Sequence, residues 1–361
     1  MTVLLRLGSF QVTPYGLLIL AGALCGVLLC LPKRKVLPVL PWVILGALLL
    51  GHAFWVFLCS PAYTEAFGTV GLMVQLWRGG YTLYGALLGG ALGALIGSRL
   101  NRLRFPEVLD ALAPGACAAI FFGRLGEYFS RQGFGNTVEN ESLCFFPLAY
   151  CTYSDGDYQE WSYAVWFWEA VAALVLLLLL VSLFRKSPEG RRTVVFVSFL
   201  GLTQILLEQM RRDDFVRLNP FVRFSQIAAA LTLLALLIVL CLRRRPSLRQ
   251  TLLTFAAFIA AVLAVMMAEF VFDKPQMTWM LYTALAATAL LLWAQLAAFR
   301  GSGASMPAGF FCLAAVLLLL LHALGSWEQD SLLLYAMMAL ALSAIGAEVA
   351  VLLPRDSTVG R

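Results

Sequence analysis

Residues 163–184 have the sequence YAVWFWEAVAALVLLLLLVSLF, in which Glu169 is the only charged residue. A helix that crosses a bilayer requires about 20 consecutive, predominantly apolar residues. Ten further stretches have this character, which brings the number of predicted spans to eleven. They cover residues 15–31, 39–59, 83–98, 109–122, 193–210, 224–242, 252–272, 277–299, 308–324 and 331–353. The sequence therefore predicts an all-α polytopic membrane protein.

The composition of the whole chain leads to the same fold class. Of its 361 residues, 61% are hydrophobic and 13% are charged, and the mean hydropathy is +0.85. Soluble domains carry about 25% charged residues and cannot bury this much apolar surface. These values exclude a soluble enzyme, a disordered chain and a nucleic-acid-binding protein. The long apolar runs also disfavour an outer-membrane barrel, whose strands alternate apolar and polar residues.

The positions of the basic residues predict the orientation of the chain. If Lys33, Arg34 and Lys35 are cytoplasmic, 17 of the 26 Lys and Arg residues fall on that side of the membrane. Cytoplasmic loops are enriched in these residues, so we expect the N-terminus outside and the C-terminus in the cytoplasm. Only Arg6 precedes the first span, and no small-residue cleavage site follows it. We therefore expect this span to be retained.

Two features divide the chain into parts. The longest polar stretch, residues 124–161, is rich in aromatic residues and predicts a small, ordered extracytoplasmic head. It contains Cys144 and Cys151, which are either joined by a disulfide on the oxidising side or free. The basic segment 243–249 predicts a boundary between a seven-span core, residues 1–249, and an appended four-span bundle, residues 250–361.

Three polar residues within the predicted spans are candidates for function. Glu169, Gln204 and Glu208 all fall in the outer half of their spans under this topology. Ionisable groups inside a membrane are costly and usually functional. We expect the two carboxylates to pair with Arg124 or Arg211. The alternative role for such pairs is to fix helix register.

Arginines on the predicted outer side indicate a phosphate site, because the planar guanidinium matches phosphate oxygens. For Arg124, which is followed by Glu127, we favour this function. For the run Arg211 to Asp214 a second interpretation is that its charges neutralise one another. The arginines cluster in three segments, which hold Arg78; Arg124 and Arg131; and Arg211, Arg212, Arg217 and Arg223.

A glycine repeat and a histidine complete the candidates. Gly85, Gly89, Gly93 and Gly97 are spaced by four residues and form one face of a helix. Such a face favours close helix packing, with a lipid path as the alternative. His52 lies in the outer half of the second span and is either a catalytic base or a hydrogen-bonded packing residue. The spacing of the Cys, His, Asp and Glu residues predicts no metal site.

The motifs of residues 10–245 resemble those of bacterial phosphatidylglycerol–prolipoprotein diacylglyceryl transferases. The strongest part of the resemblance is DALAP at residues 110–114, followed by GRLG at residues 123–126 and by Gly135. Further matches occur in the same order along the chain. They are Tyr15-Gly16, Gly79-Gly80 with Gly85, Glu169, Glu208 with Arg211, and Gln226.

The resemblance implies an enzyme that moves diacylglycerol from phosphatidylglycerol to the cysteine sulfur of a prolipoprotein signal peptide, with release of glycerol phosphate. The membrane supplies both substrates, so we expect no cofactor and no nucleic-acid partner. The alternatives are a non-catalytic protein that binds phospholipid or lipoprotein, and a related transferase with a different acceptor. A transporter is disfavoured because the two parts of the chain show no inverted repeat.

The chain departs from the family pattern at several polar positions. Tyr84 stands where the family has His, Glu127 where it has Asn, and Gln204 where it has the first Arg of its Arg-x-x-x-Glu motif. A phenol with a pKa near 10 is a poor base at neutral pH. We therefore expect His52 or Glu127 to supply the base.

The resemblance implies the following site. The catalytic candidates are Arg124, Glu208, Glu169, Tyr84 and His52, and the substrate-binding candidates are Tyr15, Glu127, Gly135, Gln204, Arg211 and Gln226.

Overall fold

The computed structural model divides the chain into two compact units. Unit 1 consists of Met1–Phe196 and Met210–Ala229, and unit 2 consists of Val197–Gln209 and Ala230–Arg361. The boundary between a core and an appended bundle, which the sequence predicts after residue 249, stays a prediction. The structure describes residues 4–7, 10–58, 80–130, 132–138, 140–155, 158–212, 217–219, 222–300, 314–318, 320–321 and 330–353.

The described residues confirm an all-α polytopic membrane protein. Among them are nine helices long and apolar enough to span a membrane. The first predicted span corresponds to the shorter apolar helix α1, Pro14–Cys30. The predicted span at residues 308–324 lies mostly outside the described residues, so the total of eleven stays a prediction. The nine helices are Arg34–Leu58, Leu83–Leu100, Phe105–Ser130, Val165–Ser182, Arg191–Met210, Phe224–Arg244, Leu248–Val271, Thr278–Phe299 and Leu333–Leu352.

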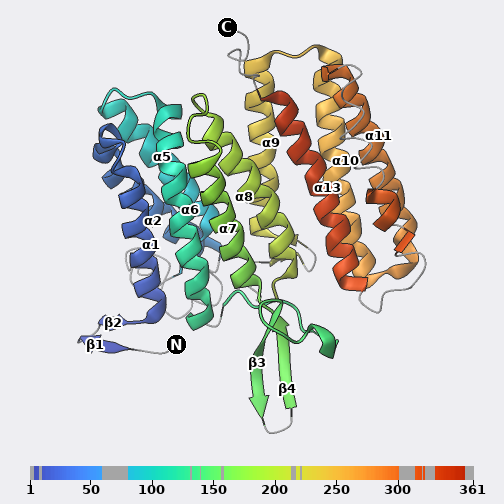
Figure 1. The fold of residues 1–361 in the computed structure, drawn as a ribbon, viewed down its shortest axis with the longest axis horizontal. Helices are drawn as coiled ribbons and strands as arrows, with labels where there is room; N and C mark the ends of the chain where they lie inside the picture. The colour runs from blue at the N-terminus through green and yellow to red at the C-terminus, as the bar shows by residue number, and fades with distance from the viewer. Residues whose placement is uncertain are drawn as a thin grey trace. The chain divides into compact units, whose positions relative to one another are not determined.

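The helices of unit 1 pack against one another in pairs (Figure 1). Helix α2, Leu40–Leu58, follows the short 3₁₀ helix η1, Arg34–Val39, and packs on α5, Leu83–Leu100. Helix α6, Phe105–Ser130, packs on α1 on one side and on α7, Val165–Ser182, on another. Helices α8, Arg191–Met210, and α9, Phe224–Arg244, each contribute residues to both units.

The glycine face of α5 lies against α2, which confirms the packing interpretation of the repeat. A Cβ atom added to Gly89 would lie 2.6 Å from the carbonyl carbon of Gly46, and one added to Gly97 would lie 2.7 Å from Val39. Only hydrogen atoms fit at these positions. The two helix backbones therefore approach each other more closely than any larger residue would permit.

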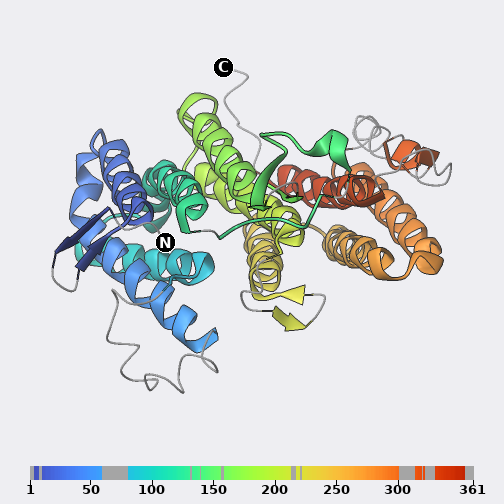
Figure 2. The same ribbon diagram turned by 90° about the horizontal axis from the view of Figure 1, so that it is seen from below.

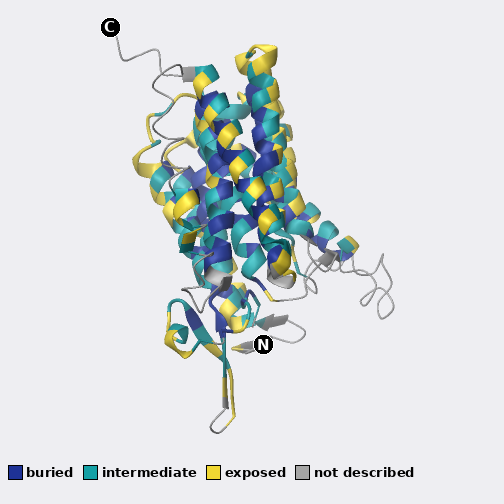
Figure 3. Ribbon diagram, turned by 90° about the vertical axis from the view of Figure 1, so that its right-hand side faces the viewer, coloured by how far each residue is buried: buried dark blue, intermediate teal, exposed yellow. Residues whose placement is uncertain are grey.

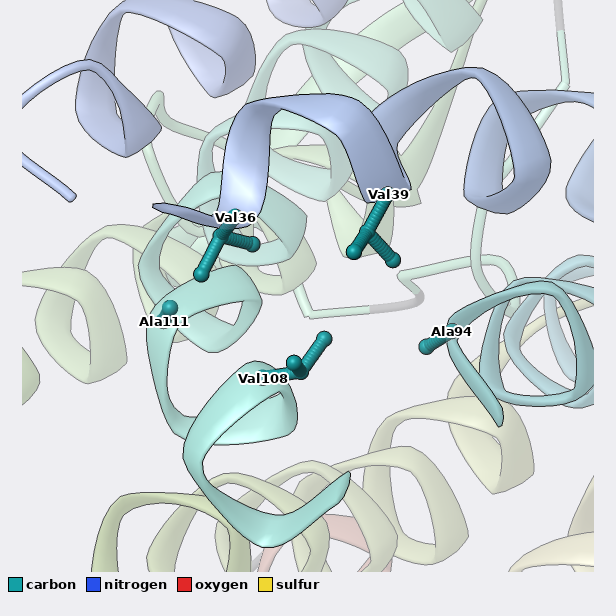
Figure 4. Close-up of a cluster of buried hydrophobic side chains, with 5 residues drawn as sticks. All are labelled: Val36, Val39, Ala94, Val108 and Ala111. Atoms are coloured by element: carbon teal, nitrogen blue, oxygen red, sulfur yellow. The ribbon is translucent and has the colours of Figure 1, made fainter. Parts of the chain in front are cut away.

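A small cluster of buried apolar side chains lies at the end of α5 that contacts η1. Val36 and Val39 of η1 point toward Ala94 of α5 and toward Val108 and Ala111 of α6 (Figure 4). The three elements are thereby held together at a point where the chain turns between spans.

Asp110 ties the start of α8 to α6 beside this cluster. Its carboxylate accepts hydrogen bonds from the backbone N–H groups of Gly190 at 2.7 Å and Thr193 at 2.8 Å, and from the Thr193 hydroxyl at 2.6 Å. The first N–H groups of a helix have no partner within the helix. Asp110 therefore acts as an N-cap supplied by a distant part of the chain, which gives a structural role to the first residue of the DALAP motif.

Two antiparallel hairpins of unit 1 lie beyond one end of its helices (Figure 1). Strands β1, Leu5–Leu7, and β2, Phe10–Val12, precede α1. Strands β3, Ala149–Asp155, and β4, Tyr158–Tyr163, lead into α7, and the outer part of this hairpin is exposed (Figure 3). A shorter pair, β5, Arg217–Asn219, and β6, Val222–Arg223, precedes α9.

The segment predicted as a head differs from the expectation at its start. Its first seven residues, 124–130, continue α6, and the remainder contains the 3₁₀ helix η2, Glu141–Leu143, and the hairpin β3–β4. The thiols of Cys144 and Cys151 are both free and donate to the carbonyl oxygens of Asn140 and Tyr153. The structure thus corresponds to the alternative without a disulfide.

Unit 2 contains a group of long helices, which Figure 2 shows from below. Helix α10, Leu248–Asp273, packs on α11, Thr278–Arg300, and on α13, Asp330–Leu352, and the 3₁₀ helix η3, Pro275–Met277, links α10 to α11. A capping box between Ser247 and Gln250 begins α10. Within the bundle Gln295 donates to the hydroxyl of Thr254 at 3.0 Å.

Candidate functional site

Two arginines and two glutamates of unit 1 form a closed ring of ion pairs. The guanidinium of Arg124 lies 2.5 Å from Glu127 Oε1 and 3.3 Å from Glu169 Oε2. The guanidinium of Arg211 lies 3.2 Å from Glu127 Oε2 and 2.9 Å from Glu169 Oε2. We call this set the arginine–glutamate ring. It confirms the predicted pairing of Glu169, which contacts both arginines.

The ring is mostly shielded from solvent. Its side chains are 12% exposed for Arg124, 13% for Glu127, 3% for Glu169 and 9% for Arg211. Charges in such surroundings interact more strongly than at a surface, and they are tolerated because each has an opposite partner.

Local structure explains how three distant segments meet at the ring. Arg124 and Glu127 are one turn apart near the C-terminal end of α6, and Glu169 lies in the second turn of α7. Arg211 is brought to them by its backbone, because it forms an antiparallel bridge with Gly135. The neighbouring bond from Asn136 N–H to the Met210 carbonyl, at 2.9 Å, continues this pairing.

Glycines allow these segments to approach. Gly133 has φ +70°, and its carbonyl accepts a hydrogen bond from Trp166 N–H at 2.9 Å, which holds the start of α7. A Cβ on Gly133 would overlap the Glu127 carboxylate. A Cβ on Gly135 would lie 2.7 Å from the Cβ of Tyr163, so this position also requires glycine.

Tyr15 lies beside the ring. It is in the first turn of α1, where the side chain of Thr13 caps the helix through Gly16 N–H at 3.1 Å. Its aromatic ring packs on Gly126, at which a Cβ would lie 2.8 Å from Tyr15 Cδ2. Glu127 and Arg124 are close enough to act on the Tyr15 phenol electrostatically. The α1–α6 contact therefore places a phenol next to the ion pairs.

His52 of α2 is buried beside two aromatic side chains. Its Nδ1 donates to the carbonyl oxygen of Gly80 at 3.3 Å, which in a neutral imidazole leaves Nε2 as the acceptor nitrogen. The ring stacks on Trp55 at 5.8 Å and lies 5.6 Å from the ring of Tyr81, measured between centroids. Tyr84, in the first turn of α5, has a buried hydroxyl group.

Tyr81 lies beside His52 and was not among the predicted site residues. It contacts His52 and interacts electrostatically with Tyr15. Partial burial raises the pKa of the Tyr81 phenol, so the group is a neutral hydroxyl at physiological pH. Its position directly after the Gly79-Gly80 pair is the signal that could have identified it.

Other predicted residues lie in different surroundings. Gln226 accepts the backbone N–H of Arg223 at 3.0 Å, and the Arg223 guanidinium donates to the carbonyl oxygen of Arg211. Arg223 thus supports the backbone that carries Arg211, a role that its place in an arginine cluster did not reveal. Gln204 and Glu208 belong to unit 2, where Gln204 Nε2 donates to Glu208 Oε2 at 2.8 Å.

The interpretation that the run at 211–214 neutralises itself stays a prediction. Arg211 pairs with Glu169 and Glu127, and Arg212 lies 2.6 Å from Glu160 of β4. Asp213 and Asp214 lie outside the described residues. Both arginines therefore join the segment after α8 to the elements around α7.

The arrangement can bind a phosphate ester. Two guanidiniums converge at one place, and their planar N–H groups match phosphate oxygens. Fixed positive groups in a water-poor site also stabilise a leaving phosphate more effectively than the same groups in water.

Comparison with known proteins identifies the family. The family model described as prolipoprotein diacylglyceryl transferase matches residues 2–243. The chain belongs to this family. The match includes the whole arginine–glutamate ring, as well as Tyr15, His52 and Tyr84.

Individual members of the family resemble the chain at modest identity. A protein of Acaryochloris marina named phosphatidylglycerol--prolipoprotein diacylglyceryl transferase is 28% identical over 237 residues, or 62% of this chain and 84% of its own length. A relative of the same name from Streptococcus suis is 27% identical over 263 residues, 68% of this chain and 93% of its own. One from Listeria monocytogenes is 27% identical over 256 residues, 67% and 89% of the two chains.

Proposed function

We propose that this protein transfers the diacylglyceryl group of phosphatidylglycerol to the lipobox cysteine of a prolipoprotein. The observation that carries the proposal is the family match over residues 2–243, within which two mostly shielded arginines converge. Relatives of the same family carry this activity in their names. The protein is accordingly a membrane-bound transferase of bacterial lipoprotein biosynthesis.

The reaction exchanges one bond at a glycerol carbon. The cysteine thiolate is the nucleophile; it attacks the diacylglycerol carbon that is esterified to phosphate. A carbon–sulfur bond forms, the carbon–oxygen bond to phosphate breaks, and glycerol phosphate leaves with the bonding electron pair. Arg124 and Arg211 hold the phosphate and stabilise the charge that develops on it.

The remaining site residues support this step. Glu169 keeps both guanidiniums oriented through its short contacts. Tyr15, beside the ring, offers a hydroxyl to the glycerol or phosphate oxygens. His52 and Glu127 are the two candidates for the base that takes the thiol proton, and Tyr84, Gln226 and Gly135 complete the proposed site in unit 1. The roles of Gln204 and Glu208, which belong to unit 2, stay predictions from the sequence.

The proposed topology has eleven spans, the N-terminus outside and the C-terminus in the cytoplasm. It is supported by the distribution of Lys and Arg residues along the sequence. In this orientation the hairpin β3–β4 and the ring lie on the outer side, where a signal peptide presents its cysteine. Residues 1–249 form the transferase core in this proposal, and residues 250–361 form an appended bundle.

A reconstituted transfer reaction tests the function. The full chain is purified in detergent, mixed with phosphatidylglycerol and a peptide that contains a lipoprotein signal and its cysteine, and analysed by mass spectrometry. We expect a diacylglyceryl adduct on sulfur with the wild type and with the control Arg104→Ala, whose side chain is 73% exposed. Arg124→Ala should lower the rate by about 100-fold or more.

The same experiment distinguishes the alternatives. If folded protein binds the lipid but forms no adduct, the proposed reaction is refuted and a binding role or another acceptor replaces it. If Arg124→Ala retains the wild-type rate, the ring is not the phosphate site.

A further inference from the structure

Three backbone segments of unit 1 pair with one another beside the arginine–glutamate ring. Residues 134–138 form the middle segment. On one side they pair with β4, through hydrogen bonds and a backbone bridge at Thr137. On the other side Gly135 forms the antiparallel bridge with Arg211. The segment that carries Arg211 is therefore the outermost of the three.

This outer segment contains two adjacent arginines that have different partners. Successive residues of an extended segment point to opposite faces. Arg211 contacts the two glutamates of the ring. The guanidinium of Arg212 reaches across the middle segment instead, where it lies 2.6 Å from the Thr137 hydroxyl and 2.6 Å from Glu160 Oε1 of β4. Arg212 thus joins all three segments through its side chain.

The register of the outer segment decides which arginine faces the ring. A shift by one residue moves every side chain of a strand to the opposite face. A shift that brought Arg212 to the ring would also bring the next residue, Asp213, into the present place of Arg212. There it would face the Glu160 carboxylate, and like charges directly opposite each other are destabilising. Glu160 therefore favours the observed register twice, because it attracts Arg212 and repels the residue that would replace it.

We propose that Arg212 and Glu160 are positioning residues, which fix the register of the outer segment and so make Arg211 the arginine that binds the phosphate. They act through Arg211 and do not themselves touch the substrate. The inference rests on the proposed function, since it concerns the phosphate site of the same reaction.

The exposure of this pair separates a positioning role from a role in overall stability. The side chain of Arg212 is 49% exposed and that of Glu160 is 29% exposed. Ion pairs with this degree of exposure contribute little to the stability of a fold. By contrast, a misplacement of a catalytic group by about 1 Å lowers a rate by up to about 100-fold. Loss of the pair should therefore slow transfer while the protein stays folded.

Transfer kinetics of the full chain test the proposal. In the reconstituted reaction we expect Arg212→Ala and Glu160→Gln each to lower kcat by about tenfold or more, with Tm within about 2 °C of the wild type. The matched control is Arg104→Ala, which removes an exposed ion pair of 2.7 Å with Glu189 and should keep the wild-type kcat. The charge-reversed double variant, Arg212→Glu with Glu160→Arg, should recover most of the lost activity.

An Arg211→Lys background distinguishes positioning from a general structural effect. A residue that acts through the guanidinium of Arg211 has little left to position once that group is replaced, so the two effects are not additive. We expect Arg212→Ala to change kcat by less than about twofold in this background. An equal fall of kcat in both backgrounds overturns the inference, as does a wild-type kcat in Arg212→Ala.

Hydrogen exchange, measured by mass spectrometry on residues 134–138, gives a readout that does not depend on turnover. The Asn136 N–H donates to the Met210 carbonyl at 2.9 Å. Arg212→Ala should make exchange of this segment about tenfold faster by permitting local opening, whereas Arg104→Ala should not. Unchanged exchange in Arg212→Ala overturns the inference. If exchange responds but the wild type transfers nothing from phosphatidylglycerol, the proposed function is refuted instead, and the pairing of the segments stands.

Discussion

Gly93→Ala is the sharpest test of the packing that positions α2 and α5. An added Cβ would lie 2.6 Å from the carbonyl carbon of Trp42 and would overlap its oxygen. Ordinary van der Waals contact begins at 3.4 Å, so the two helices must separate locally by at least 0.8 Å, the difference between this value and the distance to the carbonyl carbon. The obstructing atoms belong to the backbone of α2, and no change of rotamer can move them.

The cost of this separation follows from the loss of close packing. Insertion of a methyl group into a tightly packed interior typically costs about 1–3 kcal/mol. Gly93 lies in the middle of the glycine face, so the contact at Gly89 is loosened as well. We expect the free energy of unfolding to fall by about 2–3 kcal/mol, and Tm to fall by roughly 3–4 °C.

Gly90→Ala provides a matched control on the same helix. A Cβ at Gly90 would lie 3.7 Å from its nearest neighbour, a side-chain atom of Val43, and is accommodated without movement. Alanine also favours a helix over glycine by up to about 1 kcal/mol. Thermal unfolding of the purified full chain in detergent, followed by circular dichroism, should therefore place Gly90→Ala at or slightly above the wild type. Equal Tm values for the two variants would refute the reasoning.

Two further predictions concern buried carboxylates. Asp110→Ala leaves two backbone N–H groups and the Thr193 hydroxyl without their acceptor, so we expect a loss of about 3–5 kcal/mol in stability. Thr193→Val removes one of these bonds and should cost about 1 kcal/mol in the same unfolding assay; equal losses would contradict the capping role. Glu169→Gln removes the charge shared by Arg124 and Arg211, and we expect about 3 kcal/mol of destabilisation together with loss of transfer. Full transfer activity in a stable Glu169→Gln protein would show that the arginines do not need this carboxylate.

Most spans could be predicted from the sequence because hydropathy is a local property. The helix α6 shows the limit of this approach. Its apolar centre predicted a span at residues 109–122, whereas the helix covers Phe105–Ser130. The turns that the predicted span left out contain Glu107, Arg124 and Glu127, and these charged residues lower the local mean hydropathy. Arg124 and Glu127 are stabilised within the helix by partners that lie far away in the sequence.

The candidate site could likewise be predicted only in part from the sequence. A single carboxylate in the apolar run around Glu169 predicted an arginine partner, and the structure provides two. The bond between Arg211 and Glu127 was not predictable, because these residues are 84 positions apart and meet only through the backbone bridge at Gly135. The contact of Tyr81 with His52 likewise depends on how α2 packs on α5.

The carboxylates of the ring have a structural origin that constrains its function. Arginines within a membrane protein require counter-ions before any substrate arrives, and Glu127 and Glu169 supply them in this chain. A carboxylate that stabilises the arginines before the substrate binds must then compete with the phosphate for the same N–H groups. Because Glu169 contacts both arginines, its substitutions should affect both phosphate binding and the stability of the fold.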